Sequence, residues 1–375
     1  MNYVFTCGGT AGHINPAIAI ANLLRERHPD CNVLFIGAEG HMEEQLVPQA
    51  GYELKVLPAS GLSRKKNFAA VKQNVRAIQR AMSAVGACKK IISEFQADII
   101  IGTGGYASFP ALYAGASMGI PTCVHESNVF PGLTTRMAAS RATRILVAFE
   151  ESRQYYRHPE RVEVVGMPLQ KEFIFEDRAA SRRELGLGEQ DHLVVSAFGS
   201  LGAKRMNETM AELFALEQEA GFPFRHIHAT GKFGWEWMPD LVREKGVDLS
   251  QTPDIQMQEY FYNMPVLMAA ADVIISRAGS GTCNEIAASG LPCILIPSPN
   301  VTNNHQEKNA RLLSDRGAAV LMLESECTAQ ALLEQLQTLL ADPARRAQMG
   351  KTLHSMVRLD SAERICDIVE ELTTK

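Results

Sequence analysis

The sequence has 375 residues, of which 46% are apolar and 21% are charged, a composition typical of a globular chain and unlike that of an extended disordered one. Because one hydrophobic core rarely grows beyond about 250 to 300 residues, we expect two domains. The net charge of −5 gives no support for a nucleic-acid-binding protein. Residues 1–160 carry 16 basic and 12 acidic side chains, whereas residues 161–375 carry 21 and 30, so the two halves are expected to face different partners.

Short apolar runs that end in glycine or proline alternate with amphipathic stretches. The first half reads strand, helix, strand, helix, strand at residues 3–7, 16–27, 33–37, 42–50 and 54–57. The pattern restarts with a strand, a helix and a strand at residues 193–198, 205–220 and 225–230, and it continues to about residue 323. This order, with nearly continuous apolar strands, predicts an α/β fold with parallel sheets covered by helices on both faces.

The sequence indicates neither a secreted nor a membrane-spanning chain. Residues 1–7 lack a basic segment and lead directly into a glycine-rich turn, which predicts a first strand and not a signal peptide. Residues 99–124 are uncharged and long enough to span a bilayer, but their glycines and prolines predict a strand, a loop, a helix and a strand. The eight cysteines form no CxxC pair and most lie in apolar runs, so a reducing cytoplasm is expected.

An internal repeat favours two related domains. Residues 97–126 (AD-III-GTGG…ASMGIPTCVHE) and residues 271–297 (AD-VII-SRAGSG…AASGLPCILIP) both predict a strand, a glycine loop, a helix, Gly-x-Pro and a strand. General α/β patterning can produce such an echo, but we prefer two Rossmann-like domains, residues 1–166 and 167–355, with a cleft between them. The carboxy-terminal segment 356–375, with a predicted helix at 361–372, can pack back on the first domain.

The first glycine loop, residues 8–13, follows the first predicted strand. Its glycines let the backbone approach a ligand, and the following helix offers free N–H groups and partial positive charge to an anion. It lacks the GxGxxG dinucleotide fingerprint, and the chain has no GxxxxGK[ST] motif, which disfavours a nicotinamide dehydrogenase and a P-loop phosphotransferase. His13 is placed either to accept a proton as a neutral imidazole or only to cap or pack the helix.

Other candidate residues follow later strands. Glu126 and Asn128, in His-Glu-Ser-Asn at 125–128, lie at the carboxyl end of the fifth strand, where they bind a ligand or only cap the next helix. Residues 198–203 and 277–282 each follow a strand and open a helix, which suits a diphosphate. Glu285 is placed either to accept hydrogen bonds from ribose hydroxyls or only to complement the helix dipole. Residues 304–306 begin a helix and, taken alone, are ordinary caps.

Metal chemistry has little support. The sequence contains no Asp-x-Asp, no HExxH and no Cys/His cluster with ligand spacing. We therefore expect no metal and no cofactor, so that protein dipoles must stabilise a departing diphosphate. This favours a metal-independent, two-domain sugar transferase.

Seven motifs resemble the MurG family, the UDP-N-acetylglucosamine:N-acetylmuramyl-(pentapeptide) pyrophosphoryl-undecaprenol N-acetylglucosaminyltransferases. They are GGTAGHxxPA at 8–17, SGL at 60–62, GTGGYAS at 102–108, HESN at 125–128, GSLGA at 199–203, RAGSGTCNEIAASGLP at 277–292 and NHQxxNA at 304–310. The resemblance covers nearly the whole chain. It implies a GT-B fold and an inverting transfer of N-acetylglucosamine from UDP to the C4 hydroxyl of the muramyl unit of lipid I, which forms lipid II in peptidoglycan synthesis.

The resemblance also implies roles for individual residues. In the second domain, Ser200 would contact the diphosphate, the backbone around Phe261 the uracil, Glu285 the ribose and Gln306 the sugar. The backbone amides of Ser280, Gly281 and Thr282 would contact the phosphates, and Cys283 and Asn284 would belong to the same substrate-binding segment. In the first domain, Thr10, Ala11, Gly12 and Asn128 would approach the sugar and the acceptor, with His13 as base and Glu126 as a possible helper.

Two segments depart from the family pattern. The usual Gly-Asn-Pro-x-Arg reads Gly-Met-Pro-Leu-Gln at 166–170, so a phosphate-directed arginine is missing unless Lys171 replaces it. The usual Gly-Gly-Ser-Gln-Gly-Ala is Phe-Gly-Ser-Leu-Gly-Ala at 198–203. Donor affinity is therefore expected to be unusual. The alternatives are a related GT-B glycolipid transferase, a nucleotide-sugar epimerase, and a catalytically silent nucleotide-sugar-binding protein, although intact His13, Glu285 and Gln306 argue against the last.

Residues 54–93 contain nine basic side chains and no acidic one. Phe68, Val71, Val75, Ile78 and Met82 recur at helical spacing, which predicts an apolar stripe that faces either a membrane or the core. Because the implied acceptor is an undecaprenyl-linked lipid and anionic lipid attracts lysine and arginine, we expect a peripheral protein at the cytoplasmic face of the cell membrane. The sequence does not identify any protein partners.

Overall fold

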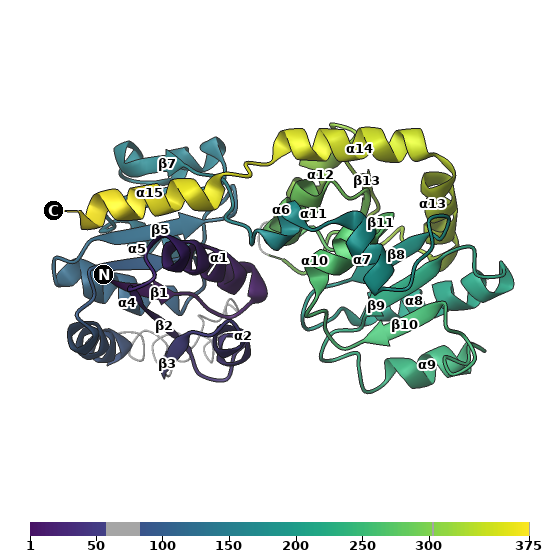
Figure 1. The fold of residues 1–375 in the computed structure, drawn as a ribbon, viewed down its shortest axis with the longest axis horizontal. Coiled ribbons are helices and arrows are strands. Elements are labelled where there is room, and N and C mark those ends of the chain that lie inside the picture. Colours follow the sequence, from purple (N-terminus) through teal and green to yellow (C-terminus); the bar gives the residue numbers. More distant parts are fainter. Residues whose placement is uncertain (58–82, 302–303, 375) are drawn as a thin grey trace, which may run out of the picture. The chain divides into compact units, whose positions relative to one another are not determined.

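The computed structural model describes residues 1–57, 83–301 and 304–374. The chain divides into two compact units: unit 1 is Met1–Gln170 with Arg358–Lys375, and unit 2 is Lys171–Val357 (Figure 1). Each unit contains one fully parallel sheet. The strand orders are β3-β2-β1-β4-β5-β6-β7 in unit 1 and β10-β9-β8-β11-β12-β13 in unit 2.

Unit 1 carries helices on both faces of its sheet. Its strands are β1 (Asn2–Thr6), β2 (Asn32–Ala38), β3 (Glu53–Leu57), β4 (Ile99–Gly102), β5 (Thr122–Glu126), β6 (Arg144–Val147) and β7 (Val162–Val164). Its helices are α1 (Ala11–Arg27), α2 (Glu43–Gln49), α4 (Ser108–Ser117), α5 (Leu133–Ala139), α15 (Ser361–Thr373) and residues 83–95. Tyr3 and Phe5 of β1 share a core with α1 and α15, whereas Val4 shares another core with α4, because successive strand residues face opposite sides.

Unit 2 repeats this layering. Its strands are β8 (Leu193–Ala197), β9 (Arg225–Ala229), β10 (Ile255–Gln258), β11 (Val273–Ser276), β12 (Cys293–Leu295) and β13 (Val320–Leu321). Its helices are α6 (Glu172–Phe175), α7 (Arg178–Glu184), α8 (Lys204–Glu219), α9 (Met238–Glu244), α10 (Met264–Ala270), α11 (Ser280–Ser289), α12 (His305–Ser314), α13 (Ala329–Ala341) and α14 (Pro343–Met356). Val195 of β8 packs in one core with α10 and α11, and Val194 packs in the other with α8 and α13.

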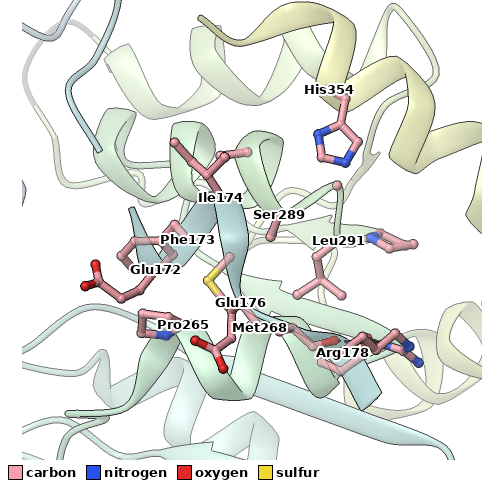
Figure 2. Close-up of a pocket in the computed structure, with 15 residues that line it drawn as sticks. Glu172, Phe173, Ile174, Glu176, Arg178, Pro265, Met268, Ser289, Leu291 and His354 are labelled. Atoms are coloured by element: carbon pink, nitrogen blue, oxygen red, sulfur yellow. Dashed lines mark hydrogen bonds between the residues drawn. The ribbon is translucent and has the colours of Figure 1, made fainter. Parts of the chain in front are cut away.

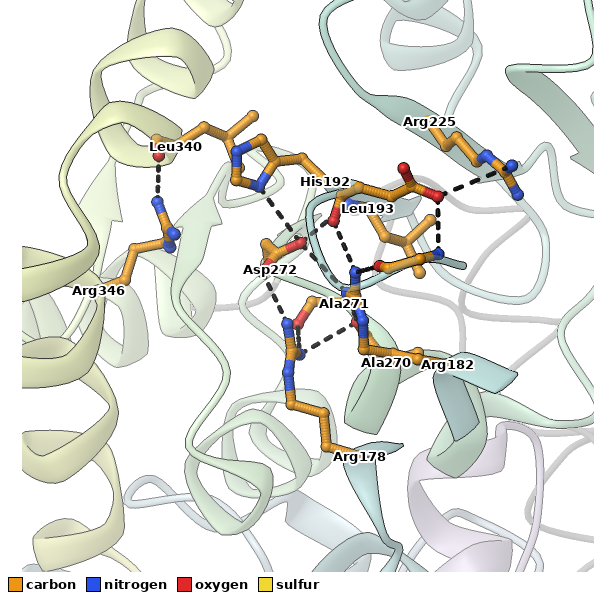
Figure 3. A network of polar contacts seen from close by, with 12 residues as sticks. Arg178, Arg182, His192, Leu193, Arg225, Ala270, Ala271, Asp272, Leu340 and Arg346 are labelled. Carbon is orange, nitrogen blue, oxygen red and sulfur yellow. Dashed lines mark hydrogen bonds and ion pairs between the residues drawn. The ribbon is translucent and has the colours of Figure 1, made fainter. Parts of the chain in front are cut away.

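The internal repeat of the sequence occupies equivalent places in the two sheets. Asp98 precedes β4 and accepts a hydrogen bond on Oδ2 from the N–H of Asn2 in β1, at 2.8 Å. Asp272 precedes β11 and accepts the equivalent bond from the N–H of Leu193 in β8, at 2.9 Å. In unit 2 the carboxylate also pairs with Arg178 at 2.7 Å, within the polar network of Figure 3. An equivalent hydrogen bond from an aspartate therefore links the central strands in both sheets, which supports the interpretation as two related domains.

The uncharged segment 99–124 forms a strand, a loop, a helix and a strand, as predicted: it spans β4, α4 and the first residues of β5. Within the described residues, no helix combines the length and the apolarity that crossing a bilayer requires. The eight cysteines, which all lie in the described ranges, form no disulfide.

The predicted start of the first helix was wrong. α1 begins at Ala11, and Pro16 lies inside it instead of in its first turn. Gly-Thr-Ala-Gly resembles a loop and proline resembles a first helical residue, but one missing N–H in the second turn is tolerated in a helix of this length. Thr10 is the N-cap residue, with extended φ and ψ of −147° and 154°. His13 consequently lies in the first turn of α1 and not in a loop.

Candidate functional site

The loops after β1 and β4 in unit 1 pack directly against each other at the carboxyl edge of the sheet. Gly9 and Gly105 adopt left-handed φ values of 92° and 81°. A Cβ atom on Gly105 would lie 2.2 Å from the carbonyl oxygen of Gly8, which no side chain tolerates. Glycine is therefore required at this crossing, where two strand ends meet at the first helix.

Glu43, which the sequence analysis did not single out, holds the first glycine turn in place. Its side chain is fully buried. Oε2 accepts a hydrogen bond from the N–H of Gly9 at 3.1 Å, and Oε1 accepts one from the N–H of Ala38 at 3.0 Å. A glutamate at a helix start normally indicates only a favourable dipole interaction, so its sequence position gave no signal of this contact.

His13 is half-buried, and its backbone carbonyl accepts a hydrogen bond from the hydroxyl of Thr103 at 2.6 Å. The ring packs on Gly104, where a Cβ atom would lie 2.6 Å from Nδ1. Burial lowers the pKa of His13 below its ordinary value of 6.5, opposed by the charge of Glu126, a separate hydrogen bond with the backbone of Thr103 and the charge of Glu43. The imidazole is therefore neutral near pH 7, as a general base requires.

Glu126, at the end of β5, is buried and organises the loop that follows. Oε1 accepts hydrogen bonds from the N–H and the side-chain amide of Asn128 at 3.0 and 2.8 Å, and Oε2 accepts one from the N–H of Gly132 at 3.0 Å. The predicted helper is thus occupied by three hydrogen bonds. Its negative charge nevertheless acts on His13, so these two predicted residues lie near each other in unit 1.

The other residues predicted in unit 1 lie at the same edge of the sheet. Thr10, Ala11 and Gly12 connect β1 to α1 and form its first turn, and Asn128 follows β5. Tyr106, which sequence reasoning passed over, follows β4, and its hydroxyl group forms a hydrogen bond with Nε2 of His41. The described part of unit 1 thus gathers its candidate acceptor residues around the ends of β1, β4 and β5.

In unit 2 the loops after β8 and β9 interlock. The carbonyl of Ser200 accepts a hydrogen bond from the N–H of Lys232 at 3.1 Å. A Cβ atom on Gly202 would lie 2.1 Å from the carbonyl oxygen of Thr230, so the backbones are in contact. Asn207 of α8, not predicted from the sequence, donates to the same carbonyl at 2.7 Å. The predicted diphosphate residue Ser200 is therefore held in a loop that contacts the loop after β9 directly.

The helix start at α11 has the geometry of an anion site. Gly279 is the N-cap residue, and the N–H groups of Ser280, Gly281 and Thr282 occupy the first turn, where helices lack internal partners for their donors. Asn284 donates to the carbonyl of Ser280 at 2.9 Å and so stiffens this turn. Backbone N–H groups aligned in this way can bind phosphate oxygens without a metal ion.

The side chain of Cys283, which is in the predicted set, faces the core of unit 2. Its side chain is buried in the core of unit 2, its N–H donates to the carbonyl of Gly279 at 2.9 Å, and burial raises the pKa of its thiol to about 12. Neither its thiol nor its N–H is available to a substrate.

Three further predicted residues lie around the same edge of unit 2. Phe261 is 4% exposed and its ring belongs to the core, so only its backbone is left to meet a ligand. Burial and the charge of Glu285 raise the pKa of the neighbouring Tyr260 to about 12, which places Glu285 beside the segment that leads to Phe261. Gln306, in the first turn of α12, accepts a hydrogen bond from the N–H of Ser298 at 2.9 Å.

A cavity of about 270 Å³ lies elsewhere in unit 2 (Figure 2). Phe173, Met268, Leu291 and His354 are among the residues that line it, together with the segments that precede β11 and β12. It therefore opens at the amino edge of the sheet, opposite the glycine loops. None of the predicted site residues lines this cavity, so we do not assign the reaction to it.

Two parallel-sheet units with glycine loops and helix starts at their carboxyl edges are the architecture of GT-B glycosyltransferases. The glycosyltransferase family 28 N-terminal domain matches residues 3–147, and the family 28 C-terminal domain matches residues 193–365. The chain therefore belongs to glycosyltransferase family 28.

A curated relative from Acetivibrio thermocellus is 37% identical over 372 residues, which cover 99% of this chain and 98% of the relative. It is named UDP-N-acetylglucosamine–N-acetylmuramyl-(pentapeptide) pyrophosphoryl-undecaprenol N-acetylglucosamine transferase. The crystal structure of Acinetobacter baumannii MurG shares the fold, with a TM-score of 0.70 and 22% identity over 99% of both chains. A Neisseria meningitidis UDP-GlcNAc 2-epimerase, with a TM-score of 0.64 and 13% identity over 99% of this chain and all of that one, shows that the fold alone does not decide the reaction.

Proposed function

We propose that this glycosyltransferase moves N-acetylglucosamine from UDP-N-acetylglucosamine to the C4 hydroxyl of the muramyl unit of lipid I and so forms lipid II. The full-length likeness to transferases named for this reaction supports the substrates. The observation that carries the chemistry is the imidazole of His13, which is half-buried, kept neutral by burial and flanked by the charges of Glu126 and Glu43. These features suit a base that removes a proton from a sugar hydroxyl.

In the proposed step the acceptor hydroxyl attacks the anomeric carbon while its proton passes to His13. The new bond joins that oxygen to the sugar, and the bond between the sugar and the diphosphate breaks with inversion. Burial keeps His13 neutral before the step, and the carboxylates of Glu126 and Glu43 stabilise the imidazolium that forms. The carboxylate of Glu126 keeps its loop contacts throughout, so we assign it an electrostatic role.

Unit 2 would hold the donor. The first turn of α11 and the loop around Ser200 stabilise the departing diphosphate through N–H groups and the helix dipole. Glu285 accepts hydrogen bonds from the ribose hydroxyls, and Gln306 approaches the sugar. Whether Lys171 replaces the arginine missing at Gln170 stays a prediction.

The acceptor requirement tests this function. Release of UDP from UDP-N-acetylglucosamine should depend on a soluble lipid I analogue, and diacylglycerol should not replace it. Turnover with diacylglycerol would favour the related glycolipid transferase. Conversion of the donor without any acceptor would favour an epimerase, and UDP binding without turnover under any condition would favour a silent binding protein.

Transfer is expected to proceed without a divalent metal ion. Within the described residues, no cluster of three or more His, Cys, Asp or Glu side chains is placed to hold one. The N–H groups at the start of α11 can neutralise part of the diphosphate charge instead. Excess EDTA should leave most of the turnover intact. A collapse in rate that magnesium or manganese specifically restores would show that helix dipoles do not suffice.

We further propose that the protein works as a peripheral protein at the cytoplasmic face of the membrane. The basic segment 54–93 supports this proposal. Residues 58–82, which include the predicted apolar stripe of that segment, lie outside the described residues. Within them, Phe130, Leu133 and Met137 are 39%, 55% and 47% exposed, on α5 and the loop before it. The guanidinium of Arg136 lies over the Phe130 ring, 5.8 Å from its centroid. Exposed apolar side chains beside a cation suit an anionic bilayer surface.

Liposome sedimentation checks this docking surface. The wild type should sediment with anionic but not zwitterionic vesicles, and salt should reduce the effect. Replacing Leu133 and Met137 with glutamate should release most of the protein while turnover of a soluble acceptor analogue is retained, and the same should hold when Arg64, Lys65, Lys66 and Lys72 become glutamate. A charge-matched control, Gln337→Glu with Thr338→Glu on α13, should sediment normally. Sedimentation of all variants like the wild type would remove both segments from the docking surface.

A further inference from the structure

A chain of four polar side chains lies fully buried in unit 2, below the loops that follow β8 and β9. Ser196 belongs to β8, His226 and His228 to β9, and Glu217 to α8, and each of them is 0% exposed. Ser196 and His228 are direct neighbours in the register of the two strands, whose place beside α8 is seen in Figure 1. The mechanism above uses none of the four.

The distances define one continuous hydrogen-bonded chain. Nδ1 of His226 lies 2.8 Å from Oε1 of Glu217, and the hydroxyl of Ser196 lies 2.8 Å from Nε2 of His226 and 2.7 Å from Nδ1 of His228. Burial, followed by the neighbouring His226, lowers the pKa of His228 to about 3, so this ring is neutral.

One set of protons satisfies these contacts. His226 donates from Nδ1 to Glu217, Ser196 donates to Nε2 of His226, and His228 donates from Nδ1 to Ser196. This leaves Nε2 of His228 and Oε2 of Glu217 as buried acceptors without a hydrogen-bond partner. The reverse direction would bury an N–H donor without an acceptor, which is the less tolerated arrangement.

The order serine, histidine, glutamate resembles that of a hydrolase triad, but Ser196 lies within a strand and its side chain has no exposed surface. No substrate carbonyl can reach its hydroxyl. Any effect of these four side chains on a ligand must therefore pass through the backbone that they hold in place.

That backbone leads directly into the loop after β8, which contains Ser200, and the loop after β9, which contains Lys232. Ser196 stands two residues before Phe198, and the ring centroids of Phe198 and His228 are 6.0 Å apart. Beyond the strands, Phe233 donates its N–H to the carbonyl of Leu201 at 3.2 Å, beside the contact of Lys232 with Ser200. A shift of either strand end would therefore be transmitted to both loops.

We propose that Glu217, acting through His226, Ser196 and His228, is a positioning residue that holds the loop of Ser200 in its donor-binding conformation. The inference rests on the proposed function, because it takes the donor diphosphate as the ligand of that loop. To that function the inference adds the buried residues that determine the conformation of the loop around Ser200. A substitution that removes the acceptor at Glu217 should therefore weaken binding of the donor, although Glu217 itself does not contact the donor.

Two substitutions at Glu217 separate positioning from simple stability. Glu217→Gln keeps an acceptor for the Nδ1–H of His226 and should bind UDP almost like the wild type. Glu217→Leu leaves that donor buried and unpaired, so the dissociation constant of UDP and the donor KM should rise by roughly a factor of ten, with the acceptor KM unchanged. Calorimetry and steady-state kinetics measure these constants.

Leu339→Ala is the matched control. Leu339 is fully buried in the last turn of α13, and its carbonyl accepts a hydrogen bond from Arg346 at 2.6 Å. Figure 3 draws the neighbouring contact of Arg346 with the carbonyl of Leu340. It should lower the melting temperature and leave UDP affinity unchanged. If Glu217→Leu does not fold, Ser196→Ala decides in its place, and a rise in the UDP dissociation constant is again expected.

The inference is overturned if the variant melts at a lower temperature but binds UDP with wild-type affinity, because the chain would then serve stability alone. A wild type that binds UDP but does not transfer the sugar would contradict the proposed function. The positioning inference would still be tested in that case, by the UDP affinities of the Glu217 variants. The two failures are therefore distinguishable.

Discussion

Replacing His13 with glutamine is expected to lower turnover by about 10²- to 10⁴-fold, the usual loss when a general base is removed. UDP affinity should stay near that of the wild type, because His13 belongs to unit 1 and the predicted UDP contacts belong to unit 2. Glutamine keeps a polar side chain of similar reach but cannot take the proton. Steady-state kinetics with a soluble acceptor analogue, together with calorimetry for UDP, measures the two effects separately.

The pH profile adds a second readout for His13. Because the neutral imidazole is the active form and its pKa lies below 6.5, wild-type turnover should rise as the pH increases through that pKa and level off near neutrality. The variant should lose this acidic limb. His158→Gln, at a half-buried histidine whose Nδ1 lies 3.1 Å from Oε1 of Glu160, is the matched control and should change neither rate nor profile. A loss below about fivefold at His13 would make its role positional and Glu126 the better candidate base.

Replacing Glu285 with alanine is expected to weaken UDP binding by at least about tenfold. A charge-assisted pair of hydrogen bonds to the ribose hydroxyls contributes roughly 1.5 to 3 kcal/mol, which sets this scale. Glu285 lies in α11, one turn beyond the N–H groups that would bind the phosphates, and its charge acts on Tyr260. Calorimetric titration with UDP gives the change directly, without any need for turnover.

A control for Glu285 removes the same charge elsewhere in unit 2. Glu334→Ala, on an exposed face of α13, alters the net charge equally and should leave UDP affinity unchanged. If Glu285→Ala binds UDP like the wild type, the carboxylate serves only the helix dipole.

Most of the fold could be predicted from the sequence because its signals are local. Apolar runs closed by glycine mark the strands, and β8, α8 and β9 lie within one residue of their predicted bounds. The internal repeat also correctly indicated equivalent positions in the two sheets, because Asp98 and Asp272 accept the same kind of hydrogen bond in each. The start of α1 was missed because glycine and proline have loop preferences that tertiary packing overrides.

The candidate site was only partly predictable for a different physical reason. The glycine loops and helix starts are contiguous motifs, but the side chains that support them come from distant segments. Glu43 reaches Gly9 across 34 residues, and Ser196 reaches His226 across 30. No local pattern distinguishes a buried carboxylate from a solvated one.

The linkage and anomeric configuration of the product test the account most directly. Wild-type enzyme, UDP-N-acetylglucosamine and a soluble lipid I analogue should yield UDP and one disaccharide product in equal amounts, to be characterised by mass spectrometry and nuclear magnetic resonance. The account predicts a single added N-acetylglucosamine on the C4 oxygen of the muramyl unit, with the configuration inverted relative to the donor. A retained configuration, a different linkage, or UDP formed without the disaccharide would contradict it.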